Sequence, residues 1–399
     1  MIHGHLHPDF WRVGQTLEKM LKDFPGGAAV CVYHGKEKVV DIWGGVMDDK
    51  GTPWHADTMA VSFSTTKGVA STALHICADR GLIDYDTPVS RYWPEFSQKG
   101  KQDITVRHVL THQAGLFGIR RLIDRAENML DWEHMVEKLA AAETQMKPGR
   151  GSAYHALTYG WLVGELVRRV SGKTMPEFLK SEIADPLKLD GLYIGVPEEE
   201  LLRVSRLVSA MKSATPKPKG KRGKKKGPDL RRQILGRIPQ VVRMAQALAP
   251  RGVGKFDFSS PEAVKASIPG ANGVFTARSL AKLYATLANG GEFDGVRLLS
   301  EDTISKISQI QVRGTDKVVP LDMQWRLGYH MAGTTKGIPR GAFGHYGFGG
   351  SGAFAHPKRK LAAALILNGG VGTNLLADLR MPQMGGAVLE SALKREGQQ

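Results

Sequence analysis

The sequence predicts an α+β fold: an antiparallel sheet flanked by N- and C-terminal helices, plus an inserted, mainly helical lobe. Two observations support this prediction. Segments rich in β-branched and aromatic residues occur near both ends of the chain, at 28–34 and 37–43 and again from about 323. Between them, apolar residues recur at the three- and four-residue spacing of amphipathic helices. We therefore expect both ends of the chain to contribute strands to one sheet.

The predicted elements follow one another in a simple order. Residues 8–24 form an amphipathic helix that Pro25-Gly26-Gly27 ends, and the strands 28–34 and 37–43 form a hairpin. Helices are expected at about 64–81, 131–142, 155–171, 175–184 and 279–288, with others capped by Thr105 and Ser300. The β pattern returns in MQWRLGYHM, AFGHY, GAFAHP and LAAALILN, followed by a last helix at about 374–394.

These elements suggest two lobes. We expect residues 1–60 and 311–399 to form the lobe that contains the sheet. Residues 61–310 would form the helical lobe, with a basic insertion at about 205–250. A chain of 399 residues, 42% of them hydrophobic, can bury enough apolar surface for more than one lobe.

Much of the net charge of +16 lies in one tract. Residues 212–232 contain ten lysines and arginines and one aspartate, so this tract alone contributes +9. Its content of Lys, Pro and Gly is typical of a solvated, flexible insertion. No run of 18 apolar residues is present, and the N-terminus lacks the pattern of a signal peptide. We therefore expect a cytoplasmic protein.

The cysteines and histidines do not predict a metal site or a cofactor. Cys31 and Cys77 lie in apolar runs and are expected to be buried free thiols. Two groups of histidines have a spacing that metal ligands can use: His108 with His112, and His3 with His5 and His7. The first group lacks an acidic or sulfur ligand nearby in sequence, and the second lies at an end that we expect to be frayed.

Ser64-Thr65-Thr66-Lys67 begins a helix that Gly81 ends. Residues at i and i+3 share a helix face, so Ser64 and Lys67 would lie side by side. A serine hydroxyl is a weak nucleophile until a base takes its proton, and a desolvated lysine can be that base. This is the S-x-x-K arrangement of serine acyl-transfer enzymes. Taken alone, the four residues fit equally a Ser N-cap followed by a solvated Lys.

Two further stretches can complete a site with Ser64 and Lys67. Tyr154 follows a Gly-rich loop and precedes a helix, and a tyrosine near a lysine ammonium can have a lowered pKa and transfer protons. Segment 344–352, GHYGFGGSG, is a strand edge that a substrate can approach and that can offer an N–H to an oxyanion. Their simpler interpretations are a Tyr packed at a helix start and a flexible hairpin.

In this order the segments resemble the serine β-lactamase-like family, which includes class C β-lactamases, D-alanyl-D-alanine peptidases and family VIII carboxylesterases. The resemblance extends over nearly the whole chain and rests on several short motifs. The motifs are Ser64-Thr65-Thr66-Lys67, Gly81-Leu82-Ile83-Asp84-Tyr85-Asp86-Thr87-Pro88-Val89, Leu110-Thr111-His112-Gln113-Ala114-Gly115-Leu116, Pro148-Gly149, Tyr154, Asn289-Gly290-Gly291 and Gly344-His345-Tyr346-Gly347.

The resemblance implies a role for each site residue. Ser64 would be the acylated nucleophile and Lys67 its activating base. Tyr154 would shuttle the proton to the leaving group. His345-Tyr346-Gly347 would occupy the family's Lys-Thr-Gly position and bind substrate. The backbone N–H groups of Ser64 and Phe348 would form the oxyanion hole.

Two departures from the family pattern favour a neutral ester over an anionic amide. The family's Tyr-x-Asn is here Tyr154-His155-Ala156, which lacks the amide that helps to hold a β-lactam side chain. His345 replaces the Lys of Lys-Thr-Gly and is largely neutral near pH 7. These departures look like those of the family VIII carboxylesterases. We therefore predict a lipase-like carboxylesterase that acts through an acyl-enzyme on a small-molecule ester.

Other functions remain open. One alternative is a β-lactamase or D-alanyl-D-alanine peptidase, and a second is an acyltransferase in which an alcohol or amine intercepts the acyl-enzyme. A third is a non-catalytic protein that binds nucleic acid through the Lys-rich tract. The tract has no interleaved aromatic residues and no recognisable nucleic-acid module, so we expect no nucleic-acid partner. The sequence does not indicate the oligomeric state.

The insertion also contains a second apolar pattern. Apolar residues from Leu230 to Leu248 are spaced as one helical face among arginines, and Pro239 should break this helix or start a second one. We interpret the segment as a lid over the mouth of the site. Together with the Lys-rich tract, residues 212–250 would make weak contact with an anionic membrane surface.

Overall fold

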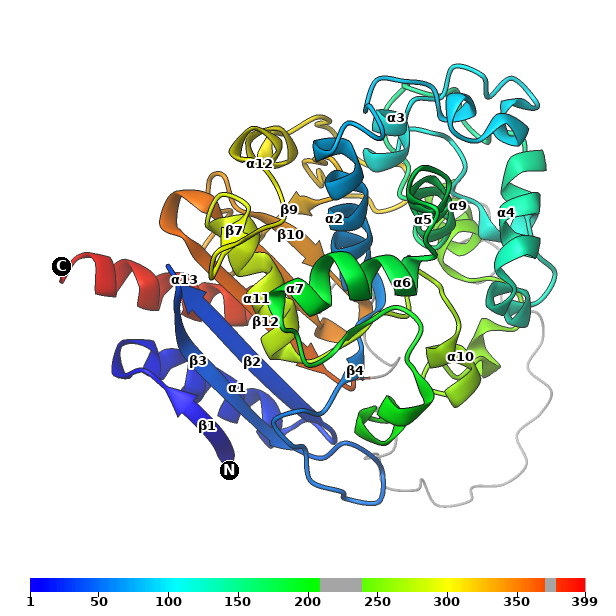
Figure 1. Ribbon diagram of the computed structural model, residues 1–399. Coiled ribbons are helices and arrows are strands. Elements are labelled where there is room, and N and C mark those ends of the chain that lie inside the picture. The colour runs from blue at the N-terminus through cyan, green and yellow to red at the C-terminus, as the bar shows by residue number, and fades with distance from the viewer. Residues whose placement is uncertain (209–238, 370–377, 399) are drawn as a thin grey trace, which may run out of the picture.

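The structure is a computed structural model that describes residues 1–208, 239–369 and 378–398 (Figure 1). The Lys-rich tract 212–232 lies outside the described residues, and so does most of the predicted basic insertion. The expectations about the tract's flexibility and its partners therefore stay predictions.

A seven-stranded antiparallel sheet forms the centre of the fold and confirms the α+β prediction. Its strand order is β1-β3-β2-β12-β11-β10-β9. The strands are β1 (Ile2–Leu6), β2 (Gly27–His34), β3 (Glu37–Gly45), β9 (His330–Met331), β10 (Phe343–Tyr346), β11 (Gly352–His356) and β12 (Leu361–Leu367). The N-terminal and C-terminal strands meet where β2 pairs with β12, with Ala28 opposite Leu367.

Two expectations about strands were wrong. The N-terminal residues are not frayed, because β1 pairs along β3 with Leu6 opposite Val40. The segment MQWRLGYHM is not one strand, because only His330–Met331 pairs in the sheet. Gln324 and Gly328 have positive φ angles of 48° and 78°, which turn the chain before it reaches β9.

Helices cover both faces of the sheet (Figure 1). Helices α1 (Trp11–Lys22) and α13 (Arg380–Glu396) pack against one face, where they share a core with inward-facing residues such as Val30 and Leu365. Helix α11 (Ala277–Ala288) packs on the opposite face, against alternate residues such as Cys31 and Ala364. This alternation is the period-2 pattern of a strand that is buried on both faces.

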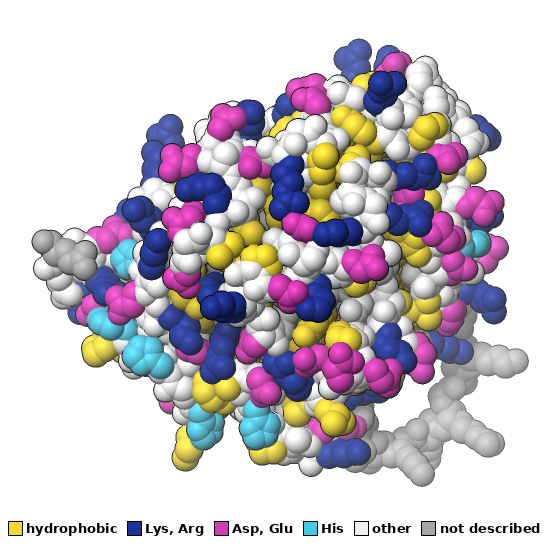
Figure 2. All heavy atoms as spheres, viewed as in Figure 1, with side chains coloured by type: hydrophobic (Ala, Val, Ile, Leu, Met, Phe, Trp, Pro, Cys, Tyr) yellow, Lys and Arg dark blue, Asp and Glu magenta, His cyan; other side chains and the backbone are white. Residues whose placement is uncertain are grey.

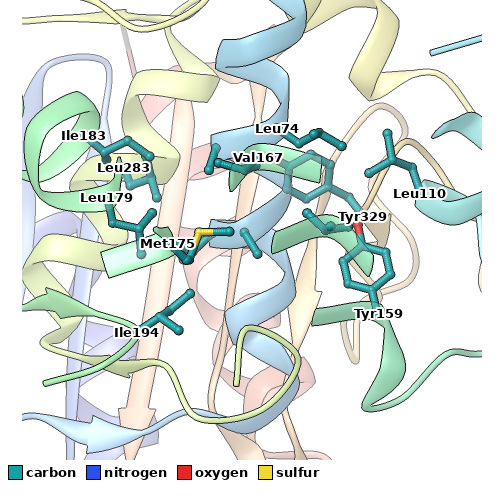
Figure 3. Close-up of a cluster of buried hydrophobic side chains, with 14 of the residues drawn as sticks. Leu74, Leu110, Tyr159, Val167, Met175, Leu179, Ile183, Ile194, Leu283 and Tyr329 are labelled. Atoms are coloured by element: carbon teal, nitrogen blue, oxygen red, sulfur yellow. The ribbon is translucent and has the colours of Figure 1, made fainter. Parts of the chain in front are cut away.

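The remaining helices lie beside the sheet, where α2 (Thr66–Asp79), whose residues are almost all buried, packs against α5 (Thr158–Ser171). They are α2 (Thr66–Asp79), α3 (Val106–Leu110), α4 (Trp132–Ala141), α5 (Thr158–Ser171), α6 (Met175–Leu179), α7 (Asp185–Leu187), α9 (Pro239–Leu248), α10 (Pro261–Lys265) and α12 (Glu301–Ser308). Figure 3 shows part of this core, where Leu74 of α2 lies near Val167 of α5 and Tyr329. A π-type segment, Lys180–Ala184, continues α6, so the helix predicted at 175–184 is present in two pieces.

Short elements connect the larger ones. A three-stranded sheet has the order β4-β6-β5, from β4 (Ala60–Val61), β5 (Leu192–Tyr193) and β6 (Val274–Phe275), and β7 (Glu292–Phe293) pairs with β8 (Val296–Arg297). Short 3-10 turns lie at Pro8–Phe10, Phe63–Thr65, Val89–Arg91, Pro94–Ser97, Ile119–Arg121, Ala126–Leu130, Glu198–Arg203, Val253–Lys255, Phe348–Gly350 and Pro357–Arg359. Thr105 and Ser300 are N-caps as predicted, since each side chain accepts a backbone N–H three residues later.

Cys31 and Cys77 are buried and free, as expected. Within the described residues, no helix is long and apolar enough to cross a membrane. Figure 2 shows acidic and basic side chains interspersed over the face in view, so this face carries no extended field of one sign. The lobe boundaries near residues 60 and 310 stay predictions, although α11 packs on the sheet rather than only on other helices.

Candidate active site

Ser64 lies in a tight turn that connects β4 to α2. The turn is the 3-10 segment Phe63–Thr65, so α2 begins at Thr66 and not at Ser64 as predicted. Phe63 has a φ of +44°, in the left-handed region that a bulky side chain seldom adopts. The Thr66 hydroxyl donates to the Phe63 carbonyl at 2.5 Å and accepts the N–H of Gly273 at 2.8 Å. A strained turn held in this way is frequent at functional sites.

The structure brings the three predicted catalytic residues together. The Oγ atom of Ser64 lies 3.0 Å from Nζ of Lys67 and 2.8 Å from the hydroxyl oxygen of Tyr154. Lys67 Nζ also donates to the carbonyl of Gly270 at 2.6 Å. The Ser64 hydroxyl oxygen is therefore within hydrogen-bond distance of an amine and of a phenol, although Ser64 and Tyr154 are 90 positions apart in sequence.

Lys67 is fully buried, and no carboxylate of the described residues forms an ion pair with it. Burial lowers the pKa of Lys67 well below its usual range. The amine is therefore favoured in its neutral form, in which its lone pair can accept a proton.

Tyr154 lies in a loop, four residues before α5 begins at Thr158. A lysine ammonium beside Tyr154 could lower the tyrosine pKa, but the structure indicates a shift in the opposite direction. Burial raises the pKa of Tyr154 above its usual value, although the hydrogen bond with Ser64 lowers it and the charge of Asp316 adds to the increase. The side chain is therefore a phenol in the resting site and can donate a hydrogen bond.

Two aromatic rings fix the orientation of Tyr154. The Trp325 ring stacks on the Tyr154 ring, with 5.4 Å between centroids and an interplanar angle of 14°. The His112 ring contacts both of them edge-on, at 5.0 Å from Tyr154 and 4.2 Å from Trp325. His112 therefore forms part of the wall behind the site, while His108 accepts the backbone N–H of Thr105 in a helix cap. The described residues include no cluster of three or more potential metal ligands.

The end of β10 forms the opposite wall of the site. A methyl group at Gly347 would lie 2.3 Å from the carbonyl oxygen of Ser62, so only glycine allows this close approach to the Ser64 turn. The Phe348 ring packs edge-on against the Phe63 ring at 5.5 Å. The predicted segment 345–348 therefore lies beside the turn that contains Ser64.

His345 is buried at this wall, and its Nδ1 lies 3.2 Å from the carbonyl oxygen of Tyr346. Burial lowers the pKa of His345 well below its usual value, and nearby His330 and Lys67 lower it further. The imidazole is neutral, so this position carries no cation.

A cavity of about 400 Å³ opens beside Ser64 and Tyr154. Its described lining is mainly apolar and includes Leu248, Val319, Leu321, Met323, Met331, Phe348, Leu379 and Pro382. Asp378 is the one charged residue among the described lining residues, and it pairs with Arg380 at 2.5 Å. The cavity can therefore hold an apolar group next to Ser64.

Helix α9 contributes one wall of this cavity. Its described part is Pro239–Leu248, directly after the residues that are not described, so the predicted effect of Pro239 on the helix stays a prediction. Leu248 lines the cavity, and Ala247 is buried in a cluster with Tyr154 and Trp325. The side chain of Gln240 donates to the carbonyl of Val318 at 2.8 Å. The position of α9 beside the cavity supports the interpretation of this segment as a lid. That the lid opens stays a prediction.

Comparison with known proteins agrees with this geometry. The family model described as Beta-lactamase matches residues 16–381 of the chain. The chain belongs to the β-lactamase family. It is 38% identical over 402 residues to the protein named "Esterase/beta-lactamase LipL" from Mycobacterium tuberculosis, a match that covers 97% of this chain and 86% of the relative.

Two solved structures support the same assignment to the β-lactamase family. A family VIII carboxylesterase superimposes with a TM-score of 0.84 at 32% identity, over 99% of each chain. A penicillin-binding protein homologue from Caulobacter crescentus superimposes with a TM-score of 0.81 at 34% identity, over 97% of this chain and 100% of that one. The family, and the resemblance to family VIII carboxylesterases, are thus confirmed. The chain is a hydrolase of the β-lactamase fold with esterase relatives.

Sequence reasoning missed two residues of the Tyr154 environment. Trp325 was placed in a strand, and Asp316 was not singled out. Asp316 lies outside every motif that the resemblance uses, and its closeness to Tyr154 depends on a loop that returns to the site. No pattern along the chain indicates such a contact.

Proposed function

We propose that the protein is a serine esterase that cleaves neutral carboxylic esters through an acyl-enzyme on Ser64. One observation carries this proposal. The Oγ of Ser64 lies 3.0 Å from the buried amine of Lys67 and 2.8 Å from the phenol of Tyr154. A serine hydroxyl next to a neutral base and a proton donor has the arrangement that acyl transfer requires. The esterase relatives support the choice of ester as substrate.

In the acylation step, Lys67 accepts the proton of Ser64 while Oγ attacks the ester carbonyl carbon. The backbone N–H groups of Ser64 and Phe348 stabilise the negative charge on the carbonyl oxygen. As the tetrahedral intermediate collapses, the Tyr154 hydroxyl donates a proton to the departing alkoxide. Lys67 then returns a proton to Tyr154, so both groups recover their resting states.

Deacylation reverses these roles with water in place of the alcohol. Water loses a proton to the Lys67–Tyr154 pair as it attacks the acyl carbon, and Ser64 Oγ leaves and takes a proton back. The products are a carboxylic acid and an alcohol. The apolar lining of the cavity supports an apolar acyl group as the part of the substrate that is held there.

The proposal is tested with the Ser64→Ala variant. Ester hydrolysis should fall on the order of 10⁶-fold, because the nucleophile is removed. A fluorophosphonate should label Ser64 in the unchanged protein, as mass spectrometry can show. The matched control is Ser62→Ala in the same turn, whose hydroxyl donates to the Ala60 carbonyl and not to Ser64. Retained hydrolysis in Ser64→Ala, or labelling at another serine, would contradict the proposal.

A β-lactamase is the second candidate, because the name of one relative includes this activity. Two observations count against rapid turnover of β-lactams. Neutral His345 stands where a permanent cation would bind an anionic substrate, and no lysine or arginine is among the described residues that line the cavity. A chromogenic cephalosporin should be turned over much more slowly than a p-nitrophenyl ester. Equal rates would favour the second candidate. Acyl transfer to an alcohol or amine stays a prediction, tested by adding these acceptors to the ester assay.

A further inference from the structure

Asp316 is a fully buried carboxylate behind the active site, and no lysine or arginine of the described residues pairs with it. Its Oδ1 accepts the backbone N–H groups of Tyr154 at 3.0 Å, Val318 at 2.8 Å and Val319 at 3.0 Å. Its Oδ2 accepts the indole N–H of Trp325 at 3.1 Å. All four partners are hydrogen-bond donors, and the two oxygens of a carboxylate can accept from all of them.

The burial of the Asp316 carboxylate without a basic partner among the described residues needs an explanation. A buried charge without an opposite charge is destabilising unless several hydrogen bonds satisfy it, and an apolar residue of similar size is often better for stability. Two of the four donors belong to the residues that define the proton-transfer side of the site. One is the backbone of Tyr154 itself, and the other is the ring of Trp325, which stacks on the Tyr154 ring.

His112 holds the backbone on either side of Tyr154. Its carbonyl oxygen accepts the N–H of Ala153 at 2.9 Å, and its Nδ1 accepts the N–H of His155 at 3.2 Å. Asp316 accepts the N–H of Tyr154 between them. Three consecutive backbone N–H groups are thus held, and the phenol is left with Ser64 Oγ as its hydrogen-bond partner at 2.8 Å.

We propose that Asp316 is a positioning residue that holds the Tyr154 backbone and the Trp325 ring so that the Tyr154 hydroxyl stays in place for proton transfer at Ser64. This inference rests on the proposed function, because it assigns proton transfer to Tyr154. The negative charge of Asp316 also adds to the effect of burial in raising the pKa of Tyr154, which keeps the phenol protonated.

The isosteric variant Asp316→Asn separates the charge and the hydrogen bonds from the shape. An amide has one acceptor oxygen, and its NH₂ group would face either the indole N–H or the three backbone N–H groups. In either orientation, therefore, the indole N–H or the three backbone N–H groups lose their acceptor. The matched control is Asp322→Asn, on the same loop but exposed, where the carboxylate accepts the N–H groups of Gly314 and Gln324.

We expect Asp316→Asn to lower kcat for a p-nitrophenyl ester about 10- to 100-fold, because displacing a catalytic group by a fraction of an ångström has effects of this size. KM should stay within about threefold, and Asp322→Asn should change neither constant by more than about twofold. Val319 and Leu321 of the same loop line the cavity, so Asp316 has an alternative role in shaping the wall. A raised KM with unchanged kcat would assign that role and overturn the proposal.

A double-variant cycle tests whether Asp316 acts through Tyr154. In the background of Tyr154→Phe, Asp316→Asn should lower the residual rate by less than about twofold, because the group that it positions is already absent. Equal losses in both backgrounds would overturn the proposal. If Asp316→Asn does not fold, Trp325→Phe replaces it in the cycle, because this variant removes the indole donor and keeps a smaller aromatic ring beside Tyr154. The proposed function fails separately, if Ser64→Ala retains activity.

Discussion

The Nζ of Lys67 lies over the ring of Tyr154, 5.0 Å from its centre, while Ser64 Oγ is within hydrogen-bond distance of both side chains. Burial favours the neutral amine before the reaction. If Lys67 takes the serine proton as proposed, the ring face and the Gly270 carbonyl would stabilise the new ammonium. We therefore expect Lys67 to be the resting base and Tyr154 the resting proton donor.

This assignment predicts the pH dependence of hydrolysis. Lys67 acts as a base only when it is neutral, so activity should be present above its lowered pKa and be lost as the pH falls through that pKa. Lys67→Arg should remain inactive at every pH, because a guanidinium stays charged. The check is kcat/KM of the unchanged protein and of Lys67→Arg between pH 5 and 10. An active Lys67→Arg variant would contradict the assignment.

Lys67 and Tyr154 should also behave as one unit. Lys67→Ala and Tyr154→Phe should each lower kcat by roughly 10³-fold or more, and the double variant should lose little beyond the larger single loss. Steady-state kinetics of the three variants test this expectation. Losses that multiply in full would show that the two residues act independently.

The cavity wall formed by α9 should select acyl chain length. Leu248→Ala removes apolar contact area, so kcat/KM for an eight-carbon p-nitrophenyl ester should fall about 10-fold, while the acetyl ester should be affected less than about twofold. Leu202→Ala, at a side chain that is 91% exposed, is the control. Equal losses for both esters in Leu248→Ala would argue against contact between α9 and the acyl chain.

The buried histidines make stability sensitive to acid. Burial lowers the pKa of His75 from 6.5 to about 4, while its ring nitrogens hydrogen-bond to Tyr85 and Leu327. In the unfolded chain His75 binds a proton near pH 6.5, so the contribution of the buried neutral imidazole to the free energy of unfolding is fully present above that pH. It is lost as the pH falls toward 4, by roughly 3 kcal/mol in the limit.

Urea unfolding at pH 7.5 and pH 4.5 tests this effect. The loss of unfolding free energy between the two values should be smaller in His75→Gln, whose side chain does not titrate. His3→Gln, at an exposed position on β1, should leave the loss unchanged. The same loss in His75→Gln as in the unchanged protein would remove His75 as the cause.

Contact with an anionic membrane surface stays a prediction from the sequence. Ten basic residues within 212–232 should bind vesicles that contain anionic lipid, with binding that weakens as salt increases. Sedimentation with anionic and with neutral vesicles tests this, using the full chain and a chain without 212–232. No binding, or binding that the deletion does not change, would contradict the prediction and leave α9 as part of the cavity wall only.

Local patterns predicted most of the fold because the relevant physics acts within a few residues. Thr105 and Ser300 were recognised as caps from their own chemistry, and the i, i+3 spacing of Ser64 and Lys67 placed the two side chains together. The exact start of α2 was not predictable, because the Thr66 hydroxyl that binds the Phe63 carbonyl also accepts the N–H of Gly273, which lies far along the chain.

Contacts between distant segments explain what the sequence did not predict. The spacing of His108 and His112 predicted no metal site, and it also did not show that the His112 ring packs on Tyr154 and Trp325. A lowered Tyr154 pKa was considered possible, but burial outweighs the hydrogen bond with Ser64 that lowers the pKa, and that burial is created by segments from elsewhere in the chain. Spacing in sequence contains no information on such packing.

The pairing of β2 with β12 has a consequence for how the chain reaches its fold. Ala28 and Leu367 are neighbours in the sheet but are made at opposite ends of synthesis, which are separated by tens of seconds at ordinary translation rates. Until β12 emerges, the hairpin of β2 and β3 has an unpaired edge in the middle of the future sheet. The nascent chain therefore passes through a long interval in which that edge can pair with other chains. Chaperone binding during synthesis should matter more for its yield than the stability of the finished protein would suggest.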